Sequence, residues 1–143
     1  MTTEFIFRIF TSLHRSLRGS GLGKIRLFRD ARDVLYRAFR PHTPRIVEVG
    51  GAKLWVDPST AGGIVPWLLI DGVHEPAETR TIREQVPPGG SFVDVGANIG
   101  YYTVLAAIVA GPGGRVYGFE PEPVNFRTLK KNIELNGLKN VVA

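Results

Sequence analysis

The chain has 143 residues, of which 43% are hydrophobic, and this length suits one domain that buries about two-thirds of its unfolded surface. Cysteine is absent, which excludes a disulfide framework and a thiolate metal site and is typical of a reducing compartment. His14, His42 and His74 lie far apart in the sequence and show no ligand spacing, so we expect no metal. We expect a cytoplasmic protein.

The net charge of +5 is unevenly distributed. Residues 1–45 hold ten Lys and Arg against three acids, whereas residues 46–143 hold eight against ten. No apolar run approaches the roughly 18 residues that span a bilayer, and Arg8 interrupts the apolar opening FIFRIF. We therefore predict neither a transmembrane helix nor a secretory signal.

Two basic amphipathic helices are predicted in the first 44 residues, one from Phe5 to Leu17 and one from about Lys24 to Phe39. Glycines separate them: Gly19, Gly21 and Gly23. The residues expected to face inward are Ile6, Ile9, Phe10, Leu13 and Leu17 in the first helix and Ile25, Phe28, Leu35, Ala38 and Phe39 in the second. The arginines are expected to face outward: Arg8, Arg15 and Arg18, then Arg26, Arg29, Arg32, Arg37 and Arg40. This arm either covers the flank of the domain or adheres to anionic lipid or an acidic partner such as RNA.

Pro41 and Pro44 end the arm, so residues 1–44 form one predicted domain and residues 45–143 the other. Residues 46–49 and 52–56 predict a β-hairpin around Gly50-Gly51. The apolar run 64–70 contains Pro66, which argues against a central strand, and we expect it to cap the core. A helix is predicted over 76–86, and the hairpin and helix together make up residues 45–90.

The central stretch is FVDVGANIGYY, residues 92–102. It predicts a strand, a glycine-rich turn and then a buried helix over 101–110, which is the first half of a nucleotide-binding unit. A second strand follows at 115–119, then a helix opened by Pro121 and Pro123, and a third strand begins at 140–142. The fold class is α/β: a Rossmann-like sheet with three core strands in residues 91–143, preceded by a hairpin and a helical arm.

Glu120 ends the second strand, where a carboxylate faces the ribose of a bound nucleoside. Its two oxygens can accept from both ribose hydroxyls. A dinucleotide site would need G-x-G-x-x-G, but Asn98 and Tyr101 stand at two of the three glycine positions counted from Gly96. A P-loop is also excluded, because no Lys-Ser or Lys-Thr follows the glycines.

Residues of about 72–142 resemble the FkbM family of S-adenosylmethionine-dependent methyltransferases, through DVGANIGYYT, FEPEP and NIELNGLKNV at these intervals. The resemblance implies a class I methyltransferase that methylates a hydroxyl of a sugar or natural product, with S-adenosylmethionine as cofactor and a small-molecule or saccharide acceptor. It also implies the cofactor-binding residues: Asp94, Gly96, Asn98 and Gly100 at the methionine moiety, Glu120 at the ribose and Pro121 near the adenine. His74 and Glu75 are candidates for substrate contact or proton transfer. The alternative is that Glu75 favours the start of the following helix while His74 is a loop residue.

Family members continue with further strands, so we expect a truncated enzyme that is weak or inactive alone. Its first core strand would have an open edge for self-association or for a complementing C-terminal half. This main hypothesis expects no nucleic-acid partner. Two alternatives stay open: an RNA methyltransferase that modifies tRNA, and a non-enzymatic fragment that contacts the membrane peripherally through residues 1–40.

Overall fold

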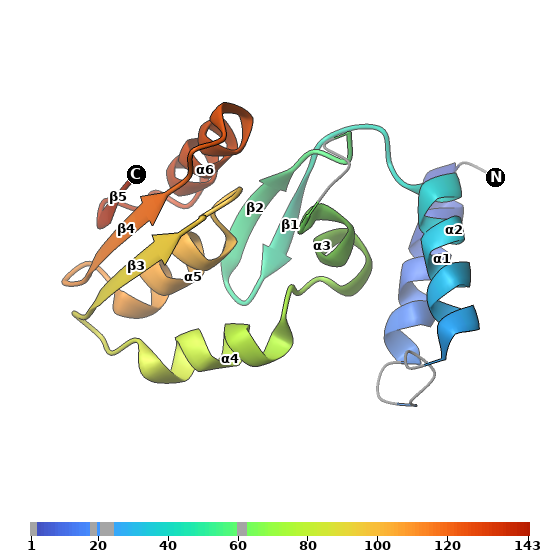
Figure 1. Cartoon of the computed structure of the whole chain (residues 1–143), viewed down its shortest axis with the longest axis horizontal. Helices are drawn as coiled ribbons and strands as arrows, with labels where there is room; N and C mark the ends of the chain where they lie inside the picture. Colours follow the sequence, from blue (N-terminus) through green and yellow to red (C-terminus); the bar gives the residue numbers. More distant parts are fainter. Residues whose placement is uncertain (1–2, 18–19, 21–24, 60–62) are drawn as a thin grey trace. The chain divides into compact units, whose positions relative to one another are not determined.

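The computed structural model describes residues 3–17, 20, 25–59 and 63–143, and it divides into two compact units (Figure 1). The first unit comprises residues 1–44 and 57–74, and the second comprises residues 45–56 and 75–143. Segment 57–74 thus packs with the helical arm, and we describe each unit by itself.

The second unit is built on a parallel three-stranded sheet of order β3-β4-β5, formed by Ser91–Val95, Arg115–Phe119 and Val141–Val142. Helix α5 (Tyr101–Ala110) packs against β3 and β4, and α4 (Pro76–Gln85) packs against α5 (Figure 1). Helix α6 (Pro123–Leu135) joins β4 to β5. The predicted fold class is confirmed: an α/β unit with a Rossmann-like sheet of three parallel core strands.

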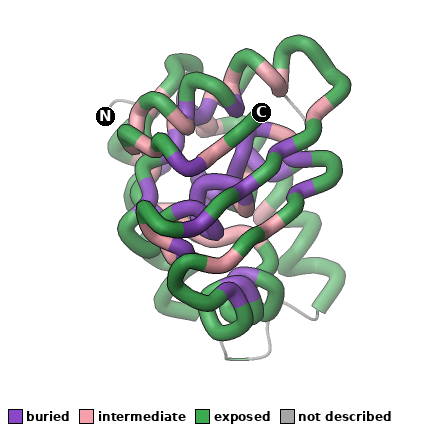
Figure 2. The backbone as a smooth tube through the Cα atoms, turned by 90° about the vertical axis from the view of Figure 1, so that its left-hand side faces the viewer, coloured by how far each residue is buried: buried purple, intermediate pink, exposed green. Residues whose placement is uncertain are grey.

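Helix α5 is the centre of this unit because seven of its ten residues are buried (Figure 2). The sequence YYTVLAAIVA contains no breaker and is apolar nearly all round, as expected of a helix with no solvent face. Its C-terminal carbonyl groups find a partner in Asn140, whose Nδ2 donates to the oxygens of Ala107 and Gly111 at 2.9 and 2.8 Å. The helix therefore has a fixed end on the sheet.

The predicted hairpin is present as antiparallel strands β1 (Arg45–Val49) and β2 (Ala52–Val56). Helix α6 supplies the neighbour on the other side of β2 through two asparagines one turn apart. Asn132 accepts from the backbone N of Trp55 at 2.7 Å, and Asn136 accepts from the backbone N of Lys53 at 2.8 Å. The amide Nδ2 groups donate back to the carbonyl oxygens of the same two residues. The two asparagines thus act as a strand partner for β2.

The first unit contains α1 (Thr3–Ser16), α2 (Arg26–Phe39) and α3 (Val65–Asp71). The run that we expected to cap the core is α3, with Pro66 in its first turn and Leu68 fully buried. Helix α1 packs on α3, where Arg15 Nε donates to the Ile70 carbonyl at 2.8 Å. His14 Nε2 lies 3.2 Å from an oxygen of Asp71. The glycines predicted to separate α1 from α2 lie outside the described residues.

The predicted inward faces of these two helices are wrong. Helix α1 buries Phe7 and Thr11, whereas Ile9 and Leu13 are 51% and 59% exposed. Helix α2 buries Tyr36 and leaves apolar side chains exposed: Ile25, Phe28 and Leu35. The reason is that apolar residues cover more than one side of α1, so its contact with α2 and α3 selects one stripe among several.

No helix within the described ranges is long and apolar enough to cross a bilayer.

Candidate functional site

The site lies where β3 and β4 end side by side. Their parallel register pairs Val95 with Phe119, so the glycine loop after β3 meets the residue after β4. The backbone N–H groups of Gly96 and Ala97 both donate to the Phe119 carbonyl, at 2.8 and 2.9 Å. The loop is therefore anchored on the end of the neighbouring strand.

Three residues of this loop have left-handed backbone: Gly96 at φ 83°, Asn98 at φ 52° and Gly100 at φ 89°. Asn98 confirms the expectation that asparagine replaces a glycine here, and its Oδ1 accepts from the backbone N of Ile99 at 2.8 Å. Gly100 is sterically required as well, because a Cβ there would lie 2.6 Å from Cδ1 of Leu129. At Gly96 a Cβ would meet nothing within 4 Å, so the backbone at that point is open to a ligand.

Glu120 lies directly against this loop. Its Oε2 accepts from the backbone N of Asn98 at 2.7 Å, and its Oε1 accepts from the backbone N of Glu122 at 2.8 Å. Each oxygen has a second lone pair, so the carboxylate is held in place by the backbone and can still accept from two hydroxyl groups. Pro121 follows Glu120 directly and is exposed.

Asp94 is the buried carboxyl of the site, 9% exposed on the face of β3 that α5 covers. Thr103 in the first turn of α5 donates its hydroxyl to Oδ2 at 2.5 Å. Burial raises the pKa of Asp94 above its usual value; the Thr103 hydrogen bonds oppose this, and the charge of Glu120 adds to it. Two carboxyl groups thus act on one another at this edge of the sheet.

Glu75 and His74 fall in different units, Glu75 in the second and His74 in the first. Glu75 precedes α4 with a left-handed φ of 41°, and it accepts a hydrogen bond from the hydroxyl of Tyr102 at 2.5 Å. Burial is the largest cause that raises the pKa of Tyr102, and this hydrogen bond is the second. Because Tyr102 stands two residues after Gly100, Glu75 is tied to the start of α5. The role of the pair in catalysis stays a prediction.

Two residues around the site are not among those predicted. Asn132 of α6 is fully buried, and its Nδ2 donates to the carbonyl of Ile99 in the glycine loop at 2.8 Å. Thr103 fixes Asp94. A polar residue at an inward position of a helix, among apolar inward neighbours, is the sequence feature that marks both. Among the residues that the structure describes, no cluster of three or more metal-ligating side chains occurs.

Comparison with known proteins identifies the class of this site. Residues 47–143 match the family model of the TRM5/TYW2 methyltransferase domain. Among solved structures, M. jannaschii TYW2 in complex with AdoMet is 25% identical with a TM-score of 0.56, over 71% of this chain and 42% of that one. The M. jannaschii tRNA m1G37 methyltransferase is 24% identical with a TM-score of 0.55, over 73% of this chain and 30% of that one, a similarity that shows the fold.

A curated relative also matches part of the chain. The protein-L-isoaspartate O-methyltransferase of Aeropyrum pernix is 42% identical over 55 residues, which is 38% of this chain and 21% of that protein. The chain thus spans well under half of the length of these relatives. All of them are consistent with one enzyme class, the S-adenosylmethionine-dependent methyltransferases, with S-adenosylmethionine as cofactor.

These findings correct the specific resemblance drawn from the sequence. The class, the cofactor and the fold are confirmed, but the family is TRM5/TYW2 and not FkbM. The expected methylation of a hydroxyl on a sugar or natural product is wrong, because the matching family and its structural relatives are not sugar methyltransferases. The expectation of no nucleic-acid partner loses its support as well, because it followed from the sugar methyltransferase hypothesis.

Proposed function

Because the chain belongs to the TRM5/TYW2 methyltransferase domain family, we propose that its second unit binds S-adenosylmethionine at the glycine loop and methylates a nucleotide of RNA. A tRNA is the first candidate for that RNA, since one structural relative is a tRNA m1G37 methyltransferase. This is the alternative that the sequence left open, and the family match now favours it.

One observation supports the cofactor site above all others: Glu120 Oε2 lies 2.7 Å from the backbone N of Asn98. It brings a carboxylate and the glycine bend to one point, as the parallel pairing of β3 and β4 requires. A nucleoside presents a pair of ribose hydroxyls, and the free lone pairs of Glu120 suit both. The residues present therefore fit S-adenosylmethionine.

The remaining roles follow from position. Gly96 and Gly100 let the methionine part of the cofactor approach the backbone, while Asn98 holds the bend between them. Asp94 lies below the bend, where a carboxyl group can act on the charged amino-acid end. Pro121 follows the ribose-binding carboxylate and offers an apolar ring to the adenine.

The chemistry asks little more of the protein than alignment. The cofactor supplies a methyl group on a sulfonium sulfur, so these residues bind and orient it and exclude water. A proton must leave the acceptor, and we propose Glu75 with its neighbour His74 for contact with the acceptor or for that proton. Glu75 is held at the start of α5 by Tyr102, close in the chain to the glycine loop.

Calorimetric titration of the chain with S-adenosylmethionine tests the cofactor site. Glu120→Gln keeps an oxygen for the Asn98 N–H but loses the charge, so affinity should fall about ten- to hundredfold. Glu134→Gln on the exposed side of α6 is the matched control and should bind as the parent does. Equal affinity of the parent and Glu120→Gln would remove the basis of the proposal. Transfer of a labelled methyl group to tRNA, compared with a DNA of the same sequence, tests the acceptor.

A further inference from the structure

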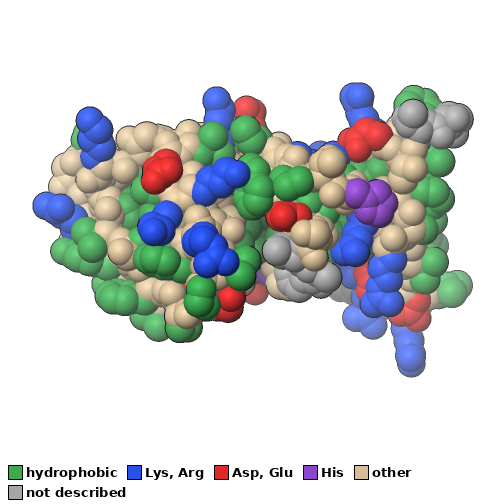
Figure 3. Space-filling view, turned by 90° about the horizontal axis from the view of Figure 1, so that it is seen from above, with side chains coloured by type: hydrophobic (Ala, Val, Ile, Leu, Met, Phe, Trp, Pro, Cys, Tyr) green, Lys and Arg blue, Asp and Glu red, His purple; other side chains and the backbone are tan. Residues whose placement is uncertain are grey.

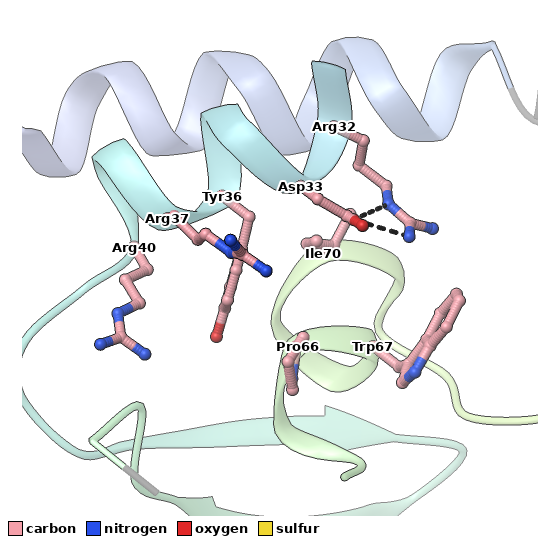
Figure 4. A pocket seen from close by; sticks show the side chains of 8 residues that line it. All are labelled: Arg32, Asp33, Tyr36, Arg37, Arg40, Pro66, Trp67 and Ile70. Atoms are coloured by element: carbon pink, nitrogen blue, oxygen red, sulfur yellow. Dashed lines mark hydrogen bonds and ion pairs between the residues drawn. The ribbon is translucent and has the colours of Figure 1, made fainter. Parts of the chain in front are cut away.

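The first unit contains a pocket of about 640 Å³ that has no role in the proposed methyltransferase function (Figure 4). It is lined by residues of α2 and α3: Arg32, Asp33, Tyr36, Arg37, Arg40, Pro66, Trp67 and Ile70. The part contributed by α2 lies outside the residues that match the family model. The pocket is therefore formed in part by the helical arm, which the family model does not cover.

The lining is positively charged. Three guanidinium groups face one carboxylate, that of Asp33, which leaves an excess of two positive charges. Asp33 is already engaged, because its Oδ1 lies 2.7 Å from Nη2 and 2.9 Å from Nε of Arg32 (Figure 4). Arg40 Nη1 donates to the carbonyl of Pro58 at 3.0 Å, a bond that positions the group without neutralising it. The pocket thus has a net charge to offer to a ligand.

Among the three arginines that line the pocket, Arg37 has the fewest hydrogen-bond and ion-pair partners. With the part of the chain that the structure describes, it makes no ion pair or hydrogen bond. Figure 4 shows it among the side chains that α2 contributes to the pocket. A planar guanidinium with free N–H groups suits a phosphate, to which it can donate two parallel hydrogen bonds.

Aromatic rings accompany the charges. Tyr36 is 8% exposed, and burial raises the pKa of its hydroxyl above the usual value although Arg40 beside it acts in the opposite direction. Trp67 is 43% exposed, with the guanidinium of Arg32 at 4.8 Å from the ring centroid. Aromatic and guanidinium planes set side by side are the surfaces on which unpaired bases stack.

We propose that this pocket binds the phosphodiester backbone of single-stranded RNA, with Arg37 on a phosphate and Trp67 beside a base. The inference rests on the proposed function for the identity of the macromolecule, and it adds a second RNA contact away from the cofactor site. A concave site of guanidinium groups and ring planes fits a chain of phosphates and bases, whereas a lipid surface calls for a convex apolar face. Figure 3 shows further arginine side chains over the first unit, with acidic side chains among them.

Fluorescence anisotropy of the full chain with a labelled tRNA transcript, over a range of KCl concentrations, tests the pocket. Arg37→Gln should weaken binding about five- to tenfold and lower the slope of log K against log[salt] by about one unit, because one phosphate contact is lost. Arg37→Lys should keep the slope but lose part of the affinity, since it retains the charge without the fork. Arg26→Gln is the control: its side chain is 89% exposed, it does not line the pocket, and binding should stay unchanged.

Three results would overturn the proposal: no RNA binding by the parent chain, equal losses in Arg37→Gln and Arg26→Gln, or an Arg37→Gln variant that loses binding to anionic phosphatidylserine vesicles but not to tRNA. Calorimetry with S-adenosylmethionine on the same variants distinguishes a failure of this proposal from a failure of the proposed function. A chain that binds both the cofactor and RNA, with the Arg37→Gln variant binding RNA as the parent does, refutes the pocket alone. A chain that binds RNA through Arg37 but not the cofactor refutes the cofactor site alone.

Discussion

Removing the side chain of Asn132 should destabilise the second unit far more than removing that of Asn136, although the two make the same pair of bonds to β2. Asn132 is fully buried, and Asn132→Ala leaves the Trp55 N–H and the Ile99 carbonyl without their partners. Each buried group left unpaired costs about 1–3 kcal/mol, so the free energy of unfolding should fall by about 4 kcal/mol. Asn136 bonds to exposed Lys53, where water can replace it, and Asn136→Ala should cost about 1 kcal/mol.

Urea unfolding followed by circular dichroism at 222 nm (the far-ultraviolet helix band) measures both losses, with the slope m as a check that the same surface unfolds. Equal losses in the two variants would refute the reasoning, because it depends on burial and not on the number of bonds. The two variants can also be compared in cofactor binding. Ile99 belongs to the glycine loop, so Asn132→Ala should weaken S-adenosylmethionine binding under conditions in which the variant is folded, while Asn136→Ala should not.

The glycine loop and its acid give two further predictions. Gly100→Ala places a Cβ 2.6 Å from Leu129 at φ 89° and should lower the free energy of unfolding by about 3 kcal/mol. Gly96→Ala meets open space and should cost only the backbone strain of about 1 kcal/mol. Thermal melts that rank the two variants the other way would contradict this prediction. The raised pKa of Asp94 means that the folded state binds more protons than the unfolded state across the carboxyl titration range, so stability falls as pH rises through it. Asp94→Asn keeps an acceptor for Thr103 and is neutral at every pH, so its Tm should gain on the parent's as the pH rises from about 4 to neutrality. A constant gap at both pH values would argue against a buried carboxylate.

The sheet and the loop could be predicted from sequence because local chemistry decides them. A strand of apolar residues, a bend with glycine or asparagine at each left-handed position and a helix without a solvent face leave few other arrangements. The proximity of Glu120 to the bend follows in turn from parallel pairing, which places both strand ends at one edge. Each step uses residues close in sequence or a rule of topology.

The arm shows where that reasoning ends. Periodicity indicates helices in residues 3–16 and 26–39, but the apolar face of α1 is broad and contains more than one stripe that could be buried. Which stripe is buried depends on α3, a partner more than 50 residues later in the chain. The same contact turns Arg15 toward the Ile70 carbonyl, although the sequence suggests an outward arginine.

The family assignment failed for a related reason. In our proposal the motifs around Gly96 and Glu120 contact the cofactor, and all methyltransferases of this class bind the same cofactor, so these motifs define the class well. The acceptor is selected by residues that face the other side of the methyl group, and none of them is fixed by the chemistry of ribose or methionine binding. The cofactor-binding motifs alone therefore do not distinguish a sugar acceptor from an RNA acceptor.

The carboxyl groups of Asp94 and Glu120 carry an electrostatic cost, and the same two groups are the ones that we propose bind the cofactor. Burial and the neighbouring charge of Glu120 both disfavour the ionised form of Asp94, so the empty site carries an electrostatic penalty that a leucine or asparagine would avoid. If the two carboxyl groups hold the cofactor as we propose, a positively charged sulfonium and amino group relieve that penalty on binding. The transfer step removes the sulfonium charge, so the same two acids hold the product less strongly than the substrate. In our proposal, a site that is unfavourable when empty thus favours exchange of spent cofactor for fresh cofactor, which gives a buried acid a use beside a half-buried one.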